Sequence, residues 1–524
     1  MADHHVAALA YLSWNPSAPS DVLLRLLTHD DQAIRRNVAQ RRGLPPEVVD
    51  AIVTDPDPEL RIEFATSANA DPAQRARLID DPARRVVIAL AIGPTPYRKP
   101  VEPLPDRAYE RLLAHPDGRI RCETVTSHAV PGHLLAGLAD HPDGPLRQAA
   151  CRAWDSLSDD TKEALLHDDD LDVRRTAAMR VCHQDAERTA WLVESLADSW
   201  LQKTVLRHGK LSRELAERLV TDDHPGSVAA NPSLPPDLVA RLATHRDPRV
   251  RLVVSARPEL TERERAAVDY TVGPEDRLDV LDWVWEARDD PEVLRRCATS
   301  AHTWLRRSAA VCPGLEPEYV ELLSRDEDFA VRLLLCEFHP EPPPETLLDL
   351  YLNGTHRAVM MFASHPRFPA AGLAERFADS TDPEERRLAL TDPDLPVETL
   401  EEFARDPDRR WAAGRDPRLP VPLIRELLDD PDTTHLAAGN PGLPAEDMHR
   451  LLDGAGVPDQ PDNALGDRAL RPVAKGDLLH CGRLGSGARA RRASPGGAGG
   501  IPRSPGPLRG RPATGWSRCR PDRR

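Results

Sequence analysis

The chain has few aromatic residues, no long apolar run and no paired cysteines. Only 4% of its 524 residues are aromatic, and no stretch approaches the roughly 20 apolar residues of a membrane-spanning helix. The first ten residues lack the basic region and apolar core of a signal peptide. No Cys-x-x-Cys pair occurs, and six of the eight cysteines stand in or beside apolar runs: Cys122, Cys151, Cys182, Cys297, Cys312 and Cys336. Reduced core thiols and a cytoplasmic location are therefore expected.

Motifs that signal an enzyme are also lacking. The sequence contains no Walker loop, Gly-x-Gly-x-x-Gly, His-Glu-x-x-His or Gly-x-Ser-x-Gly pattern, so it offers neither a phosphate cradle nor an activated nucleophile. Acidic clusters such as 168–170 fall where turns are expected, and Asp is common in turns. We expect no catalytic activity and no cofactor.

Three histidines in register invite a zinc hypothesis. His115, His141 and His167 are each 26 residues apart. Stacked helices lie about 8–10 Å apart, whereas zinc binds nitrogen at about 2 Å. Histidine also suits the negative end of a helix, so no metal site is expected.

Proline is abundant, and it is spread along the chain. The 52 prolines are about twice the average usage, and many stand in helix starts of the type Leu-Pro-Pro-x-Leu. Examples begin at Leu44, Leu234, Leu395, Leu419 and Leu443. Proline fits the first helical turn, because that turn needs no amide donor there. Regular punctuation of this kind indicates a repeat array.

A second signal, Asp-x-x-x-Arg, recurs in phase with the first. It appears ten times, for example at Asp143 and Arg147, and most successive arginines are 24, 26 or 27 residues apart. A residue type fixed in each repeat serves stacking better than a single ligand. We expect Asp to cap a helix and Arg to bond neighbouring Asp or carbonyl groups.

The two signals together predict an all-α fold. About sixteen repeats of 24–27 residues, each one α-helix plus a short α or 3-10 helix, stack into an elongated right-handed superhelical solenoid. One such unit cannot bury its own apolar stripe, so stacking must create the core. The short elements are expected to line the concave face.

The repeat resembles the leucine-rich repeat variant family. The resemblance is carried by 230–243, which reads Ala-Asn-Pro-Ser-Leu-Pro-Pro-Asp-Leu-Val-Ala-Arg-Leu-Ala, followed by Asp247 to Arg251; Asn15-Pro16 and 440–444 match the same signature. It covers roughly residues 10 to 455. It implies alternating α- and 3-10 helices, similar in appearance to HEAT repeats, and it implies no shared catalytic activity.

The predicted domains are the solenoid, 1–455, with a Pro-rich loop insertion near 93–103, and a tail, 456–524. The last 49 residues hold eleven Arg against two Asp, whereas the preceding residues carry a net charge of about −25. The Gly/Pro/Arg-rich tail is expected to be disordered. A nucleic-acid arm and an out-of-frame read of the gene remain two open explanations for it.

Tryptophan marks the candidate binding site. Trp200 and Trp304 share one repeat phase on the short elements, with Arg249 and Arg306 nearby, and Trp and Arg dominate interface hot spots. The alternative is that these indoles fill the core where repeats are degenerate. We therefore expect a non-catalytic scaffold that binds a protein or peptide, with basic segments favoured, on the concave face. Two alternatives are a nucleic-acid-binding solenoid, which the acidic body disfavours, and an assembly or modification factor with cryptic enzyme activity.

Overall fold

The computed structural model describes residues 2–95, 101–127, 129–196, 199–221, 225–407 and 410–459, and all regular elements within these ranges are helices. The predicted tail lies almost wholly outside them, as do 96–100 of the predicted loop insertion. Within the same ranges no helix is long and apolar enough to cross a bilayer.

The helices follow one another in pairs, and in many pairs the two elements are of similar length, as in Ser20–Leu27 with Gln32–Ala39 or Pro236–Ala243 with Pro248–Ser255. In chain order they are α1 (Ala2–Leu12), α2 (Ser20–Leu27), α3 (Gln32–Ala39), α4 (Pro46–Val53), α5 (Pro58–Ala65), α6 (Pro72–Arg75), η1 (Ala76–Asp80), α7 (Arg84–Ile92), α8 (Asp106–Leu113), α9 (Gly118–Thr126), α10 (Gly132–Ala136), α11 (Gly144–Ala150), η2 (Cys151–Ser156), α12 (Asp159–Leu166), α13 (Leu171–Val181), α14 (Ala186–Ser195), α15 (Ser199–His208), α16 (Arg213–Thr221), α17 (Pro225–Val228), α18 (Pro236–Ala243), α19 (Pro248–Ser255), α20 (Glu262–Ala267), α21 (Asp282–Glu286), α22 (Pro291–Ala298), α23 (Thr303–Ala310), α24 (Pro317–Ser324), α25 (Phe329–Phe338), α26 (Pro344–Asn353), η3 (Arg357–Ser364), α27 (Leu373–Phe377), α28 (Pro383–Ala389), α29 (Val397–Arg405), α30 (Arg410–Ala413), α31 (Val421–Asp429), α32 (Thr434–Ala438) and α33 (Ala445–Gly454).

The pair α18 and α19 shows why the sequence folds in this way. Helix α18 begins with proline in its first turn, as the Leu-Pro-Pro signal predicts, and buries Leu238 and Leu242 on one face. Asp247 then caps α19, because its side chain accepts a hydrogen bond from the Arg249 amide at 2.9 Å. Each helix leaves an apolar stripe that only the neighbouring pairs cover.

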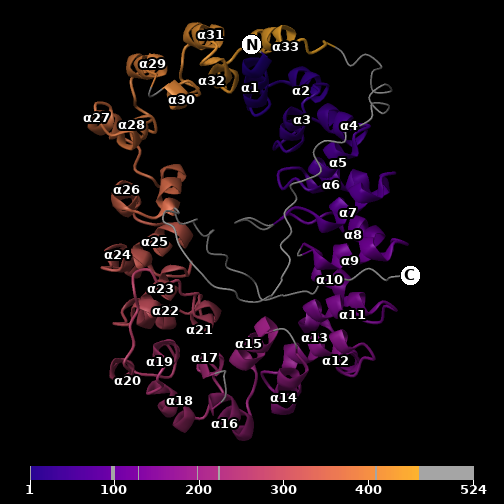
Figure 1. Cartoon of the computed structure of the whole chain (residues 1–524), viewed down its shortest axis with the longest axis vertical. Helices are drawn as coiled ribbons and strands as arrows, with labels where there is room; N and C mark the ends of the chain where they lie inside the picture. The colour runs from indigo at the N-terminus through magenta and orange to yellow at the C-terminus, as the bar shows by residue number, and fades with distance from the viewer. Residues whose placement is uncertain are drawn as a thin grey trace, which may run out of the picture.

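Two rows of elements result. The outer row holds the first element of each pair: α2, α4, α6 with η1, α8, α10, α12, α14, α16, α18, α20, α22, α24, α26, α27, α29, α31 and α33. The inner row holds the second: α1, α3, α5, α7, α9, α11 with η2, α13, α15, α17, α19, α21, α23, α25, η3, α28, α30 and α32. Figure 1 shows inner elements such as α13, α15, α25 and α32 on the side that faces the middle of the molecule. The second elements therefore line the concave side, as expected. The prediction that they are shorter than the first elements is wrong for many pairs, since α13 has 11 residues and α25 has 10, against 8 in α12 and in α24.

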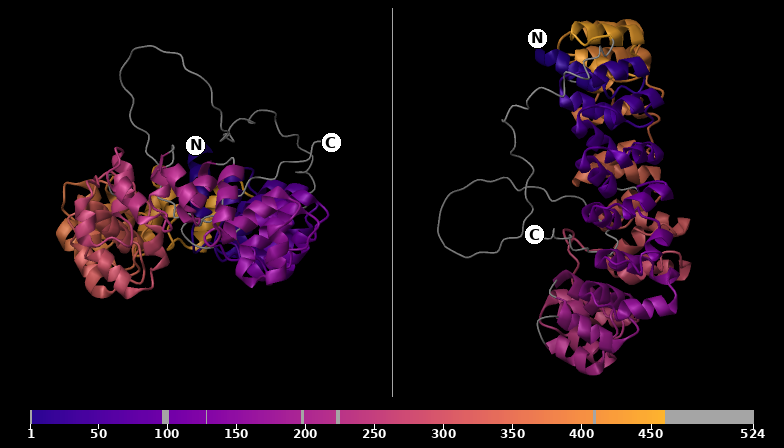
Figure 2. Two further views of the ribbon diagram at one scale, coloured as in Figure 1. Left: turned by 90° about the horizontal axis from the view of Figure 1, so that it is seen from below. Right: turned by 90° about the vertical axis from the view of Figure 1, so that its right-hand side faces the viewer.

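The array is not open, because its two ends meet. Helix α1 packs on α32 and α33, and α2 packs on α33. Figure 1 shows α33 beside α1 and α2, and Figure 2 shows the first and last helices together at one end of the molecule. The helices therefore follow a closed loop, which the prediction of an elongated solenoid did not include.

The chain ends complete one repeat between them. The chain begins with an inner element, α1, and its last described helix, α33, is an outer element. The buried Asn15 amide after α1 donates to the carbonyls of Ala438 and Asn440, at 2.9 and 2.7 Å. Asn231 makes the same contacts inside the array, to Leu206 and Gly209, both at 2.8 Å. The seam is therefore bonded like an internal joint.

A buried arginine adds to this seam. Arg25 on α2 is 4% exposed and pairs with Asp453 of α33 at 2.5 Å. The same guanidinium donates to the carbonyl of Val457 at 2.5 Å, and the imidazole of His449 lies 3.0 Å from Asp21. Arg25 is buried while Asp453 is 61% exposed, so the firmer part of this seam is the hydrogen bond from the buried guanidinium to the Val457 carbonyl. A buried charge needs such partners, and these contacts join α2 to the end of the array.

Of the six cysteines predicted to be reduced core thiols, five are. Cys122 is also buried but is disulfide-bonded, so the prediction of a reduced thiol is wrong for this residue. Cys151, Cys182, Cys297, Cys312 and Cys336 are buried free thiols. Burial raises the pKa of Cys151, Cys297, Cys312 and Cys336 to about 12. These thiols pack as small apolar groups and are poor nucleophiles.

Candidate partner-binding face

The Asp-x-x-x-Arg ladder joins successive repeats. Arg147 donates to both carboxylate oxygens of Asp168 in the next repeat, at 2.7 and 2.8 Å. It also donates to the carbonyls of His141 and Pro142 in its own loop. The expected stacking role of this ladder is confirmed.

Most histidines in this repeat phase accept a hydrogen bond within the loop that follows the helix. The Nδ1 atoms of His115 and His141 each accept a hydrogen bond from the amide two residues later, at 3.0 Å. His29 and His245 do the same. His167 is the exception, since its Nδ1 lies 3.0 Å from the Glu163 carbonyl. Among the described residues, no group of three or more potential metal ligands comes together.

Arg306 belongs to the ladder. Its guanidinium contacts Asp326 in the next repeat at 2.7 Å, and its side chain is only 12% exposed. It also donates to the carbonyls of Ser300 and Ala301. Arg306 is therefore placed for stacking, while Arg249, on α19, is exposed.

The two tryptophans of the predicted site differ in burial. Trp200 on α15 is 43% exposed. Trp304 on α23 is half-buried against the core, and its indole Nε1 donates to the Asp279 carbonyl at 2.8 Å. Both lie on inner elements, but with α17, α19 and α21 between them in the row, so the four predicted residues do not form one compact cluster.

The structure identifies further exposed apolar side chains on the inner row. Of the fourteen large apolar residues that are exposed in the described ranges, ten lie on or directly after inner elements: Val6, Trp14, Ile92, Leu171, Trp200, Trp285, Phe338, Met360, Met361 and Trp411. The outer row covers the other side of these elements. Their exposed side chains therefore face the middle of the loop or its rims.

Sequence reasoning missed most of these residues. Trp285 and Trp411 each carry an arginine over the ring, Arg288 at 5.3 Å and Arg387 at 4.7 Å from the ring centre. Such contacts hold an exposed indole in place. Both tryptophans stand in the second half of a repeat, away from the Leu-Pro helix start. That position in the sequence is a signal that would have predicted Trp285 and Trp411 as inner-row residues.

Exposed cations of the inner row are largely neutralised by acids on neighbouring elements. Arg36 pairs with Glu63 at 2.8 Å, and Arg207 pairs with Asp282 at 3.2 Å. Arg84 likewise pairs with Asp117. Across the described part of the inner row, this pairing works against a continuous basic stripe of the kind that phosphate backbones require.

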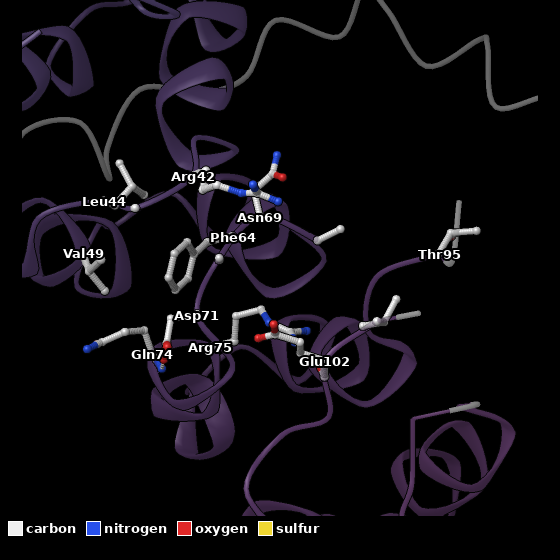
Figure 3. A pocket seen from close by; sticks show the side chains of 14 residues that line it. Arg42, Leu44, Val49, Phe64, Asn69, Asp71, Gln74, Arg75, Thr95 and Glu102 are labelled. Atoms are coloured by element: carbon white, nitrogen blue, oxygen red, sulfur yellow. Dashed lines mark hydrogen bonds between the residues drawn. The ribbon is translucent and has the colours of Figure 1, made fainter. Parts of the chain in front are cut away.

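A cavity of about 610 Å³ lies apart from this face. It is bounded by the loops that join an inner element to the next outer helix, near α4 and α6, and Figure 3 shows Arg75, Gln74 and Asn69 around it. Phe64 and Val49 supply apolar wall. Its size is within the range of small-molecule sites.

Comparisons with known proteins give no family. No protein-family model and no curated protein matches the chain. Among solved structures, the crystal structure of an engineered protein is 16% identical over 83% of this chain and 98% of that chain, with a TM-score of 0.16. That score is too low to support an argument about fold or function, so the resemblance to the leucine-rich repeat variant family stays a prediction.

Proposed function

We propose that the protein is a non-catalytic scaffold that binds an extended polypeptide on the inner row of its closed helical loop. The observation that carries the proposal is the gathering of exposed large apolar side chains on the inner elements. These side chains are spread over eight inner elements from α1 to α30, so they offer separate anchors along the row for an extended partner. Tryptophan, which supplies four of them, is enriched among interface hot spots.

The chemistry of the partner follows from the charge. The described part of the chain is acidic, and several inner cations, such as Arg36 and Arg207, are already paired with carboxylates. A partner segment with basic and apolar residues would meet complementary charge and the exposed indoles. The proposal retains about sixteen repeats, a right-handed superhelix, membership of the leucine-rich repeat variant family and a cytoplasmic location as expectations.

The test compares inner and outer tryptophans. Binding of fluorescent unstructured peptides, basic and acidic, is measured for Trp200→Ala, Trp285→Ala and Trp411→Ala, whose indoles are 43–50% exposed. The matched control is Trp191→Ala on outer helix α14, with an indole 37% exposed. Each inner variant should weaken binding by about 2 kcal/mol, which is about thirtyfold.

The control defines the contrary outcomes. Equal losses for Trp191→Ala and the inner variants would show that binding is not confined to the inner row. Preferential binding of an oligonucleotide over every peptide would favour the nucleic-acid alternative instead.

A further inference from the structure

One buried arginine in this protein has no carboxylate partner among the described residues. Six arginines are buried in the described ranges: Arg25, Arg61, Arg75, Arg257, Arg265 and Arg307. Five of them pair with an Asp or Glu within 4 Å. Arg75 makes no such pair in this part of the chain, although it is only 2% exposed.

The position of Arg75 in its repeat is normally apolar. Counting from the helix start, Arg75 occupies the place that Val49, Val239 and Ile424 fill in other repeats, and those three side chains are buried core. An isolated buried charge is strongly destabilising unless a partner compensates it. Stability of the fold alone therefore does not explain an arginine at this core position, and a ligand that pairs with it would.

The hydrogen bonding of Arg75 is also incomplete. Its Nη2 donates to the Glu102 carbonyl at 3.2 Å, while its buried Nε has no partner among the described residues. Burial lowers the pKa of Arg75 and also that of Arg265, whose Nε is likewise without a hydrogen-bond partner in the described residues. Within this part of the chain, the absence of a carboxylate within 4 Å is therefore what distinguishes Arg75 from Arg265. A guanidinium presents five donors in a planar fork that matches a carboxylate.

Arg75 borders the cavity of about 610 Å³ (Figure 3). Phe64, Leu44 and Val49 form apolar wall, and Arg42 contributes a second cation. Two carboxylates also line the cavity. Asp71 is engaged as the cap of α6, where it accepts from the Gln74 amide at 3.0 Å, and Glu102 is exposed.

We propose that this cavity binds a small organic acid, whose carboxylate pairs with Arg75 while its apolar part packs against Phe64 and its neighbours. The site lies at the loops between the rows and does not depend on the proposed function of the inner face. The ligand carboxylate would supply the counter-ion of Arg75. Each of the other five buried arginines obtains its counter-ion from an Asp or Glu side chain of the protein.

The experiment titrates the full chain with sodium hexanoate, sodium acetate, hexylamine hydrochloride and sodium phosphate at equal ionic strength, and follows Tm and calorimetric heat. Hexanoate should bind saturably and raise Tm, acetate should bind more weakly because it lacks the apolar part, and hexylamine and phosphate should bind least. Phosphate binding more tightly than hexanoate, or hexylamine binding equally well, would overturn the assignment.

Two variants locate the effect. Arg75→Met should abolish the response to hexanoate and should have a Tm equal to or above that of the wild type, because it removes an unpaired buried charge. Arg265→Met is the matched control, since Arg265 occupies the same repeat position in α20 but pairs with Glu262 at 3.5 Å. It should lower Tm yet keep the hexanoate response. An unchanged response in Arg75→Met would refute the proposal.

Discussion

At the scale of residues, polar contacts between neighbouring repeats recur along the array. Arg251 shows the pattern: it donates to the His245 carbonyl at 2.8 Å in its own loop and to the Asp269 carboxylate at 2.9 Å beyond it. Arg249, two residues away, is exposed. Both residues are arginines, but Arg251 is hydrogen-bonded to its loop and to Asp269, whereas Arg249 is exposed to solvent.

Replacing Arg251 by Ala should lower the free energy of unfolding by about 1–3 kcal/mol, because it leaves a loop carbonyl unsatisfied. Arg249→Ala should change it by less than about 0.5 kcal/mol. Urea denaturation of both variants measures the difference. Peptide affinity should survive in Arg251→Ala as long as the repeat stays folded, and loss of binding at full helicity would reassign Arg251 to the partner.

The ladder also predicts acid sensitivity. The hydrogen bond from Arg147 holds the pKa of Asp168 below its ordinary value. A carboxylate with a lowered pKa in the folded state stabilises the fold above its unfolded pKa of about 4, and that contribution is lost as the pH falls below it. The stability gap between wild type and Asp168→Asn should therefore be present at pH 7 and shrink between about pH 5 and 3. A gap that is constant with pH would contradict this role.

At the scale of elements, the Leu-Pro helix start and the Asp cap are local chemistry, so the sequence predicts them well. Helices α4, α18, α29, α31 and α33 begin at these signals. The burial of a given indole depends on the position of the neighbouring helix pair. Where that pair departs from the repeat pattern, the local sequence does not predict its position. Trp200 and Trp304 therefore share a phase in the sequence but not an environment.

Trp304→Ala should be mainly a stability variant. Its half-buried indole packs on the core around α23 and satisfies the Asp279 carbonyl, so its loss should cost about 2 kcal/mol. Trp200→Ala should change the melting temperature less than Trp304→Ala does, since Trp200 is 43% exposed. Thermal unfolding by circular dichroism compares them, and equal melting shifts would show that the burial difference has no energetic consequence.

At the scale of the whole molecule, closure comes from small rotations added over many repeats. No single repeat encodes that sum, which is why the repeat pattern predicts a solenoid but not its closed form. One residue does bear on it. Asn15, in an Asn-Pro pair after α1, donates to the carbonyls of Ala438 and Asn440 as Asn231 does to the preceding pair inside the array.

The most direct test of this closed structure is the distance between its ends. Spin labels are placed at the exposed positions Ser17 and Ala445 by the substitutions Ser17→Cys and Ala445→Cys, after Cys122, Cys481 and Cys519 are replaced by Ser so that no other thiol is released for labelling. Because stacked helices lie about 10 Å apart, pulsed electron resonance should give one narrow distribution centred below about 30 Å. A broad distribution at longer distances would mean that α33 and α1 do not form a repeat and that the array is open.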